Sequence, residues 1–138
     1  MGIYFKAWLD VSDPVDSNKT VSYPLMDLGN AWARDTGFAP YLKKVKTISP
    51  DGEEIHRTCG EIIVTKEVLA HFDTELQKLE VELKELSTEL EDQDCENWSG
   101  LYRRFKPLNT FVDQLRDVRT CWERSFENPL VHGMVSYG

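Results

Sequence analysis

The residues best suited to bind a ligand in this sequence are arginines placed near aromatic side chains. An arginine beside an aromatic ring suits a nucleotide, because the guanidinium binds phosphate while the ring stacks on the base. The candidate ligand-binding residues are Arg57, Trp98, Tyr102, Arg103, Arg104, Arg116 and Arg119. They predict a site for a compact anionic molecule between a sheet and helices. The competing interpretation is that the arginines pair with an acidic helix that precedes most of them, with opposite charges along the helix–helix seam.

A histidine and a cysteine three residues apart, His56 and Cys59, raise the question of a metal site. Zinc needs about four ligands, and the remaining candidates are not paired at ligand spacing: His71, Cys95, Cys121 and His132. A cysteine nucleophile needs a nearby base, which Cys121 would gain only if His132 folded back towards it. We therefore expect packed thiols and no metal.

Other catalytic motifs are absent from the sequence. It has no phosphate-binding glycine-rich loop, no nucleophile elbow, no dinucleotide fingerprint and no His-Glu-x-x-His zinc helix. Eleven of the 24 Asp and Glu residues lie in the leucine-rich segment 66–96, and a solvated helix face is a poor place for general acid–base chemistry. We expect no enzymatic activity and no cofactor. A hydrolase or metal enzyme built on His56 and Cys59 ranks last among the hypotheses.

The net charge of −8 arises in one segment of the chain. Residues 66–96 hold eleven Asp or Glu and three Lys, so the remainder is balanced. This argues against a general nucleic-acid or anionic-membrane binder, which needs surplus Lys and Arg on its contact face. An acidic helix face is either solvated or contacts a basic partner. Three widely spaced cysteines form no disulfide framework, and there is no signal peptide or long apolar run, so we expect a cytoplasmic protein.

The N-terminal half has the signals of strands and turns. Residues 3–11 alternate between apolar and other side chains, which predicts a strand with one buried face. Tyr4 and Trp8 fall on the opposite face and are large for a solvated surface, so a helix or a second subunit is expected to cover them. Residues 25–34 predict a short helix, residues 41–48 and 54–64 a β-hairpin around Ser49-Pro50-Asp51-Gly52, and residues 130–137 a final strand.

The strongest pattern is a ladder of apolar residues at spacings of three and four. It comprises Leu69, Phe72, Leu76, Leu79, Leu83, Leu86 and Leu90, and Thr65 is a suitable N-cap. A second stripe follows at Leu101, Phe105, Leu108, Val112, Leu115 and Trp122, with Pro107 either starting the main helix or kinking it. The short connection predicts antiparallel neighbours. A helix of 26 residues is about 39 Å long, more than the roughly 20 Å of a small sheet, so part of the helix pair should project.

These elements predict an α+β fold in which a small antiparallel sheet of three to four strands and one short helix pack with a long C-terminal antiparallel two-helix hairpin. We expect a single domain over residues 1–138, with a β-rich part at 1–64, the helical hairpin at 65–127 and a short terminal strand at 128–138. Val68, Val81, Phe111 and Val118 widen the apolar surface of the helices beyond the ladder.

The projecting ladder predicts association, because a rod that outreaches its sheet must be shielded by something else. The candidate oligomer-interface residues are Leu76, Leu79, Leu83, Leu86, Phe111 and Val118. A compact monomer, with the short helix filling the gap, is the alternative. The favoured function is a non-enzymatic interaction protein that forms a homo-oligomer and binds or inhibits a partner, possible partners being a basic protein or an anionic small molecule. In size and charge alone the chain is similar to small acidic inhibitors, immunity proteins and phage-type counter-defence proteins. The alternative function is the sequestering of a nucleotide-like anion.

Overall fold

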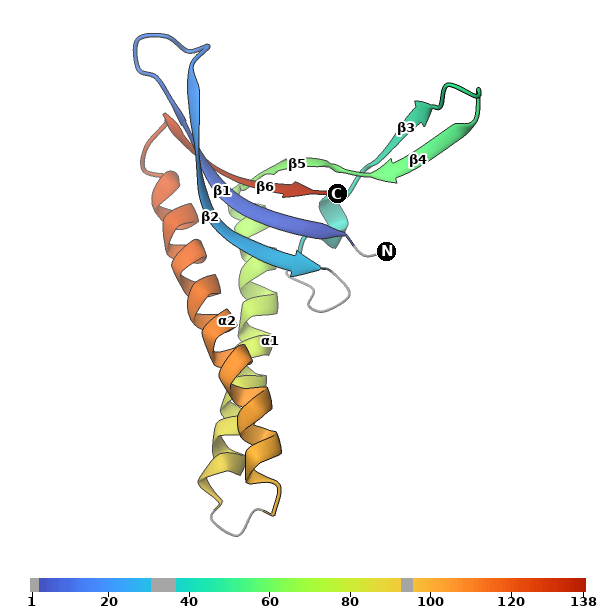
Figure 1. Cartoon of the computed structure of the whole chain (residues 1–138). Coiled ribbons are helices and arrows are strands. Elements are labelled where there is room, and N and C mark those ends of the chain that lie inside the picture. Colours follow the sequence, from blue (N-terminus) through green and yellow to red (C-terminus); the bar gives the residue numbers. More distant parts are fainter. Residues whose placement is uncertain (1–2, 31–36, 93–95) are drawn as a thin grey trace.

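The computed structural model describes residues 3–30, 37–92 and 96–138 and has a mixed α+β fold (Figure 1). It contains a four-stranded antiparallel sheet with strand order β2-β1-β6-β5, a separate two-stranded sheet β3-β4, and two long helices. The elements are β1 (Tyr4–Ser12), β2 (Thr20–Asn30), the 3-10 turn η1 (Ala39–Tyr41), β3 (Lys44–Ile48), β4 (Glu54–Thr58), β5 (Gly60–Ile63), α1 (Lys66–Glu91), α2 (Trp98–Ser125) and β6 (Val131–Tyr137).

The two helices form a stalk on one side of the four-stranded sheet, and two β arms rise on the other side (Figure 1). We call α1 and α2 together the stalk. The β1–β2 arm is the end of the β1–β2 strand pair with its connection, residues 12–20. The β3–β4 arm comprises residues 44–58. Neither strand of the β3–β4 arm contains a buried residue.

The two strands predicted near the N-terminus and the C-terminus of the chain are confirmed, and they pair with each other. β1 and β6 run antiparallel in the centre of the sheet, with Phe5 opposite Tyr137 and Ala7 opposite Val135. All four of these side chains are buried, because they lie on the face that packs against the stalk. The alternation of apolar and other side chains in residues 3–11 therefore identifies the face of β1 that is buried in the core.

The short helix predicted at residues 25–34 is wrong as far as the structure describes it. Residues 25–30 are the end of strand β2, and residues 31–34 lie outside the described part. Pairing with β1 satisfies the backbone of this segment, and two irregularities in the register absorb its uneven apolar spacing. Gly29 has φ 81°, outside the helical region. A local helical pattern was overridden by a contact with a distant strand.

The turn of the predicted β-hairpin is confirmed, but its second strand is divided. The N–H of Gly52 donates to the carbonyl of Ser49 at 2.9 Å, and Gly52 has φ 82°. Residues 54–64 form two strands, and only β5 joins the main sheet, where it pairs with β6. At the base of the arm the N–H of Lys43 donates to the hydroxyl of Tyr137 at 2.9 Å.

Both predicted helices are present and lie side by side along the stalk. Thr65 caps α1, because its hydroxyl accepts a hydrogen bond from the N–H of Val68 at 3.2 Å. Pro107 lies inside α2, which begins nine residues earlier at Trp98, so Pro107 does not start this helix. The two helices run antiparallel (Figure 1).

Trp122 connects the stalk to the sheet. Its side chain is fully buried, and its ring makes edge-on contacts with Phe72 at 5.1 Å and Phe38 at 6.1 Å between ring centroids. Its Nε1 donates to the carbonyl oxygen of Trp8 at 3.4 Å. Gly133 on β6 lies directly over the indole, where a Cβ would be 2.6 Å from Cδ1 of Trp122.

We expect Gly133→Ala to lower the free energy of unfolding by about 1–3 kcal/mol, because the added methyl overpacks a site with no free volume. Urea unfolding followed by tryptophan fluorescence measures this change. Ser136→Ala on the same strand is the control, since Ser136 faces away from the stalk, and its effect should be within about 0.5 kcal/mol. Equal stability of Gly133→Ala and the wild type would contradict the close contact.

Candidate functional site

Two of the predicted ligand-binding arginines form ion pairs between the helices. Arg119 donates to both carboxylate oxygens of Asp73, at 2.5 and 3.1 Å, and to Glu123 at 2.6 Å. These contacts raise the pKa of Arg119, chiefly through the hydrogen bond to Asp73. Arg116 pairs with Glu80 across the helices at 3.2 Å and with Asp113 on its own helix, also at 3.2 Å. The competing interpretation, pairing with the acidic helix, therefore holds for Arg116 and Arg119.

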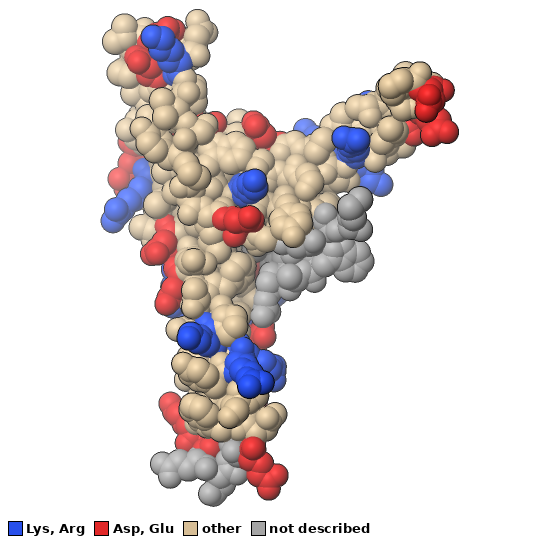
Figure 2. Space-filling view, viewed as in Figure 1, with Lys and Arg blue, Asp and Glu red and all other residues tan. Residues whose placement is uncertain are grey.

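The remaining candidates are distributed over the molecule and do not form one pocket. Arg57 lies on β4, in the exposed β3–β4 arm. Arg103 and Arg104 are exposed on α2 and form no ion pair with any described residue. Trp98 and Tyr102 stack on each other at 5.3 Å with an interplanar angle of 5°, at the end of the stalk. Figure 2 shows Lys and Arg atoms grouped over the lower stalk, with Asp and Glu atoms at its end.

The groups considered for metal binding or thiol chemistry are also apart. Cys59 and Cys121 are free thiols, and Cys95 lies outside the described residues. His132 lies on the sheet face turned away from the stalk, whereas Cys121 lies on α2. Within the described ranges, no three His, Cys, Asp or Glu side chains gather into a possible metal site. Neither described helix has the length and apolar character needed to cross a membrane.

Most of the residues proposed for an oligomer interface lie in the hydrophobic core of the single chain. Leu76, Leu79, Leu86 and Val118 are buried and belong to the hydrophobic core. Leu83 and Phe111 are only partly buried at the margin of that core. A second copy could therefore reach only these two members of the set without separating the helices.

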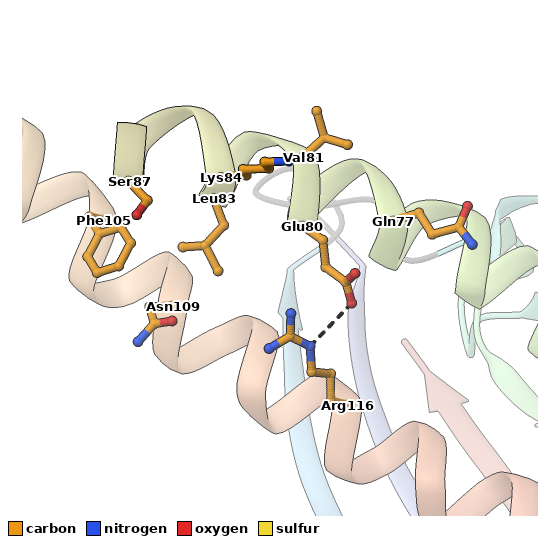
Figure 3. Close-up of a pocket in the computed structure, with 9 residues that line it drawn as sticks. All are labelled: Gln77, Glu80, Val81, Leu83, Lys84, Ser87, Phe105, Asn109 and Arg116. Atoms are coloured by element: carbon orange, nitrogen blue, oxygen red, sulfur yellow. Dashed lines mark hydrogen bonds and ion pairs between the residues drawn. The ribbon is translucent and has the colours of Figure 1, made fainter. Parts of the chain in front are cut away.

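A groove of ≈700 Å³ runs along the stalk between α1 and α2 (Figure 3). Leu83 points from α1 into the space between the helices, and Phe105 of α2 faces Ser87 across it. The Arg116–Glu80 ion pair closes one end, and Val81 stands at the rim, 58% exposed. The remaining lining residues are Gln77, Lys84 and Asn109.

The groove side of α2 continues to the aromatic pair at the end of the stalk. Trp98, Phe105, Asn109 and Arg116 are separated by seven, four and seven residues, which places them on one face of the helix. Trp98 Nε1 donates to the carbonyl of Leu90 at the end of α1, at 3.2 Å, so the indole is fixed across both helices. The spacing on α2 was visible in the sequence, but the matching residues of α1 depend on how the helices are rotated against each other.

Comparison with protein-family models, with curated proteins and with solved structures found no match.

The Arg119–Asp73 pair should stabilise the stalk measurably, because Asp73 is 27% and Arg119 34% exposed and the contact is bidentate. We expect Asp73→Asn to lower the free energy of unfolding by about 1 kcal/mol, and a double-mutant cycle with Arg119→Gln to give coupling of similar size. Arg104→Gln is the matched control and should change stability by less than about 0.5 kcal/mol. Additive effects of the two substitutions would argue against a stabilising pair.

Proposed function

We propose that this protein is a non-enzymatic interaction protein that binds a helical segment of a partner protein in the groove along its stalk. The observation that carries the proposal is the groove itself, an ≈700 Å³ depression between two antiparallel helices with an apolar floor and no described element over it. In this interpretation the stalk presents a binding surface that the sheet cannot cover.

A third helix is the occupant that suits the shape of this groove. Antiparallel helices leave a furrow between their side-chain ridges, and the ridge of another helix fits into it. Leu83 and Phe105 supply partly exposed apolar surface at the centre. The stacked Trp98 and Tyr102 add exposed aromatic surface at one end, and aromatic residues contribute most strongly at protein interfaces.

The charge of the stalk favours a basic partner helix. Residues 66–96 carry eleven Asp or Glu against three Lys, so this segment is acidic overall, while the groove lining itself holds Glu80 beside Lys84 and Arg116. An amphipathic helix would place its apolar stripe on the groove floor and its Lys or Arg side chains towards the acidic surface of α1 outside the groove. Such binding would block the partner surface that it covers, which is how a small acidic inhibitor acts.

The groove is lined by residues suited to contact rather than to bond cleavage. Its lining residues include no His and no Cys, so Ser87 has no histidine base beside it there. The nucleotide-like alternative needs arginines that converge, whereas Arg116 and Arg119 are held by carboxylates and Arg57 lies on an arm. These features favour protein binding over both alternatives.

We expect Val81→Arg and Tyr102→Ala each to weaken partner binding about tenfold or more, a loss of about 1.4 kcal/mol. Both residues are more than 40% exposed, so the fold should be retained. The partner is first captured from the source cells with the wild-type chain and purified, and affinity is then measured by calorimetry at low and high salt. Binding should weaken as salt rises.

Val21→Arg on β2 is the matched control, because Val21 is 55% exposed and lies in the four-stranded sheet, away from the groove on the stalk. Wild-type affinity in both groove variants, or loss of binding in the Val21 control, would overturn the assignment of the site.

A further inference from the structure

The sheet face turned away from the stalk carries an apolar row that crosses all four strands. Trp8 lies directly opposite Pro24 on one side and Met134 on the other, and Met134 lies opposite Ile63. This is the outer face, because Ala7 and Val135, next along β1 and β6, are buried against the stalk. Ile63 is 59% exposed. Met134 is buried, at 7% exposed, yet it does not belong to the core cluster.

Polar residues border the row on both sides. One rim contains Lys6, opposite Asp27 on β2 and Ser136 on β6, with Glu61 opposite Ser136 on β5. The other rim contains Asp10, opposite Ser22 and His132. A solvated outer face is ordinary in an antiparallel sheet, but a row of tryptophan, methionine and isoleucine between polar rims has the composition of an interface. In addition, Nε1 of Trp8 is shielded from solvent and has no acceptor among the described residues.

We propose that a second copy of this chain covers the row, sheet face against sheet face, with the twofold axis running along the row. Rotation about that axis places each row on the row of the other copy and exchanges the two rims. Lys6 then faces the partner's Asp10, and Asp10 faces the partner's Lys6. The strands of the two sheets stay aligned, which is one of the two ways in which sheets pack on each other.

The charges on the rims select this axis over the other simple one. A twofold axis parallel to the strands would keep each rim against itself and reverse the strand order. Glu61 would then face the partner's Asp27, a like-charge contact, and the Lys6–Asp10 pairs would be lost. The axis along the row forms two attractive pairs and brings no two acidic residues of the rims together.

The arms supply contact area that the sheet face lacks. Four strands over the seven paired positions of β1 and β6 cover roughly 20 by 23 Å, less than the ≈800 Å² that each partner of a stable interface usually buries. Both arms rise on the side of the row, so they would flank a second copy (Figure 1). Each bears an exposed apolar side chain, Val15 (94%) and Ile48 (72%). A two-stranded ribbon such as the β3–β4 arm is marginal alone and gains from such contact.

The dimer would point its two stalks in opposite directions, because the stalks lie on the far side of each sheet. The stalk grooves would remain open in such a dimer, which would then engage two partner segments at once and gain avidity. The dimer itself does not depend on the stalk having a partner.

Sedimentation equilibrium of the full chain tests the proposal. We expect a dimer, and Ile63→Arg should raise its dissociation constant about tenfold or more. Lys6→Glu and Asp10→Lys should each weaken it by a similar factor, and the double variant should recover the wild-type value within about threefold. Lys6 and Asp10 of one chain are about 13 Å apart along the strand, so recovery requires a contact between copies.

Two controls keep the outcome clear. Lys106→Glu on the stalk should leave the dimer unchanged, and urea unfolding of each variant checks the fold, since Asp10 also accepts a hydrogen bond from Ser22 at 2.6 Å. A monomer at all concentrations up to about 100 µM would overturn the proposal, as would a dimer that tolerates Ile63→Arg. A dimer that Ile63→Arg disrupts but the charge exchange does not restore would overturn the axis. Loss of the dimer in Val81→Arg would place the contact on the stalk instead.

Discussion

The packing of Trp122 under β6 is the constraint on which the arrangement of this protein depends. The indole comes from α2, contacts Phe72 of α1, and lies against a strand position where only glycine fits. Its Nε1 donates to the carbonyl of Trp8. The residue opposite Trp8 on β2 is Pro24, which has no N–H that could donate to that carbonyl. One side chain therefore joins both helices to the centre of the sheet and fixes the side on which the stalk stands.

The ion pairs between α1 and α2 also set how the two helices align, which gives the arginines a structural role. Arg116–Glu80 and Arg119–Asp73 join the helices at positions facing each other, so they fix the register in which the stalk is assembled. That register determines which residues line the groove. Arginines that suggested a ligand site in the sequence instead help to form the groove on the stalk, and the acidic helix is their partner as well as a solvated face.

Local patterns predicted the elements of this fold better than their associations. The leucine ladder, the Thr65 cap and the Ser49–Gly52 turn are each encoded within a few residues, and all three correspond to observed structure. Residues 25–30 failed because Leu25 and Leu28 happen to match helical spacing, whereas pairing with β1 decides their conformation. The groove was not predictable, since it depends on the rotation of two helices about their axes. The outer position of Trp8 was predictable from alternation, but its contact with Met134 needed the strand order.

The exposed apolar surfaces that suggest binding differ from the buried leucine ladder that suggested it in the sequence. The ladder of leucines would have required a cover if the helices left it open, but Leu76, Leu79 and Leu86 are buried in the core. The apolar side chains that stay partly or fully exposed are Leu83, Phe105 and Val81 on the stalk and Trp8 and Ile63 on the sheet. Among the described residues, a sheet with helices on one face and a helix pair without a third helix each leave one apolar surface unpaired. These two surfaces are separated by the core around Trp122, so contact at one does not obstruct contact at the other.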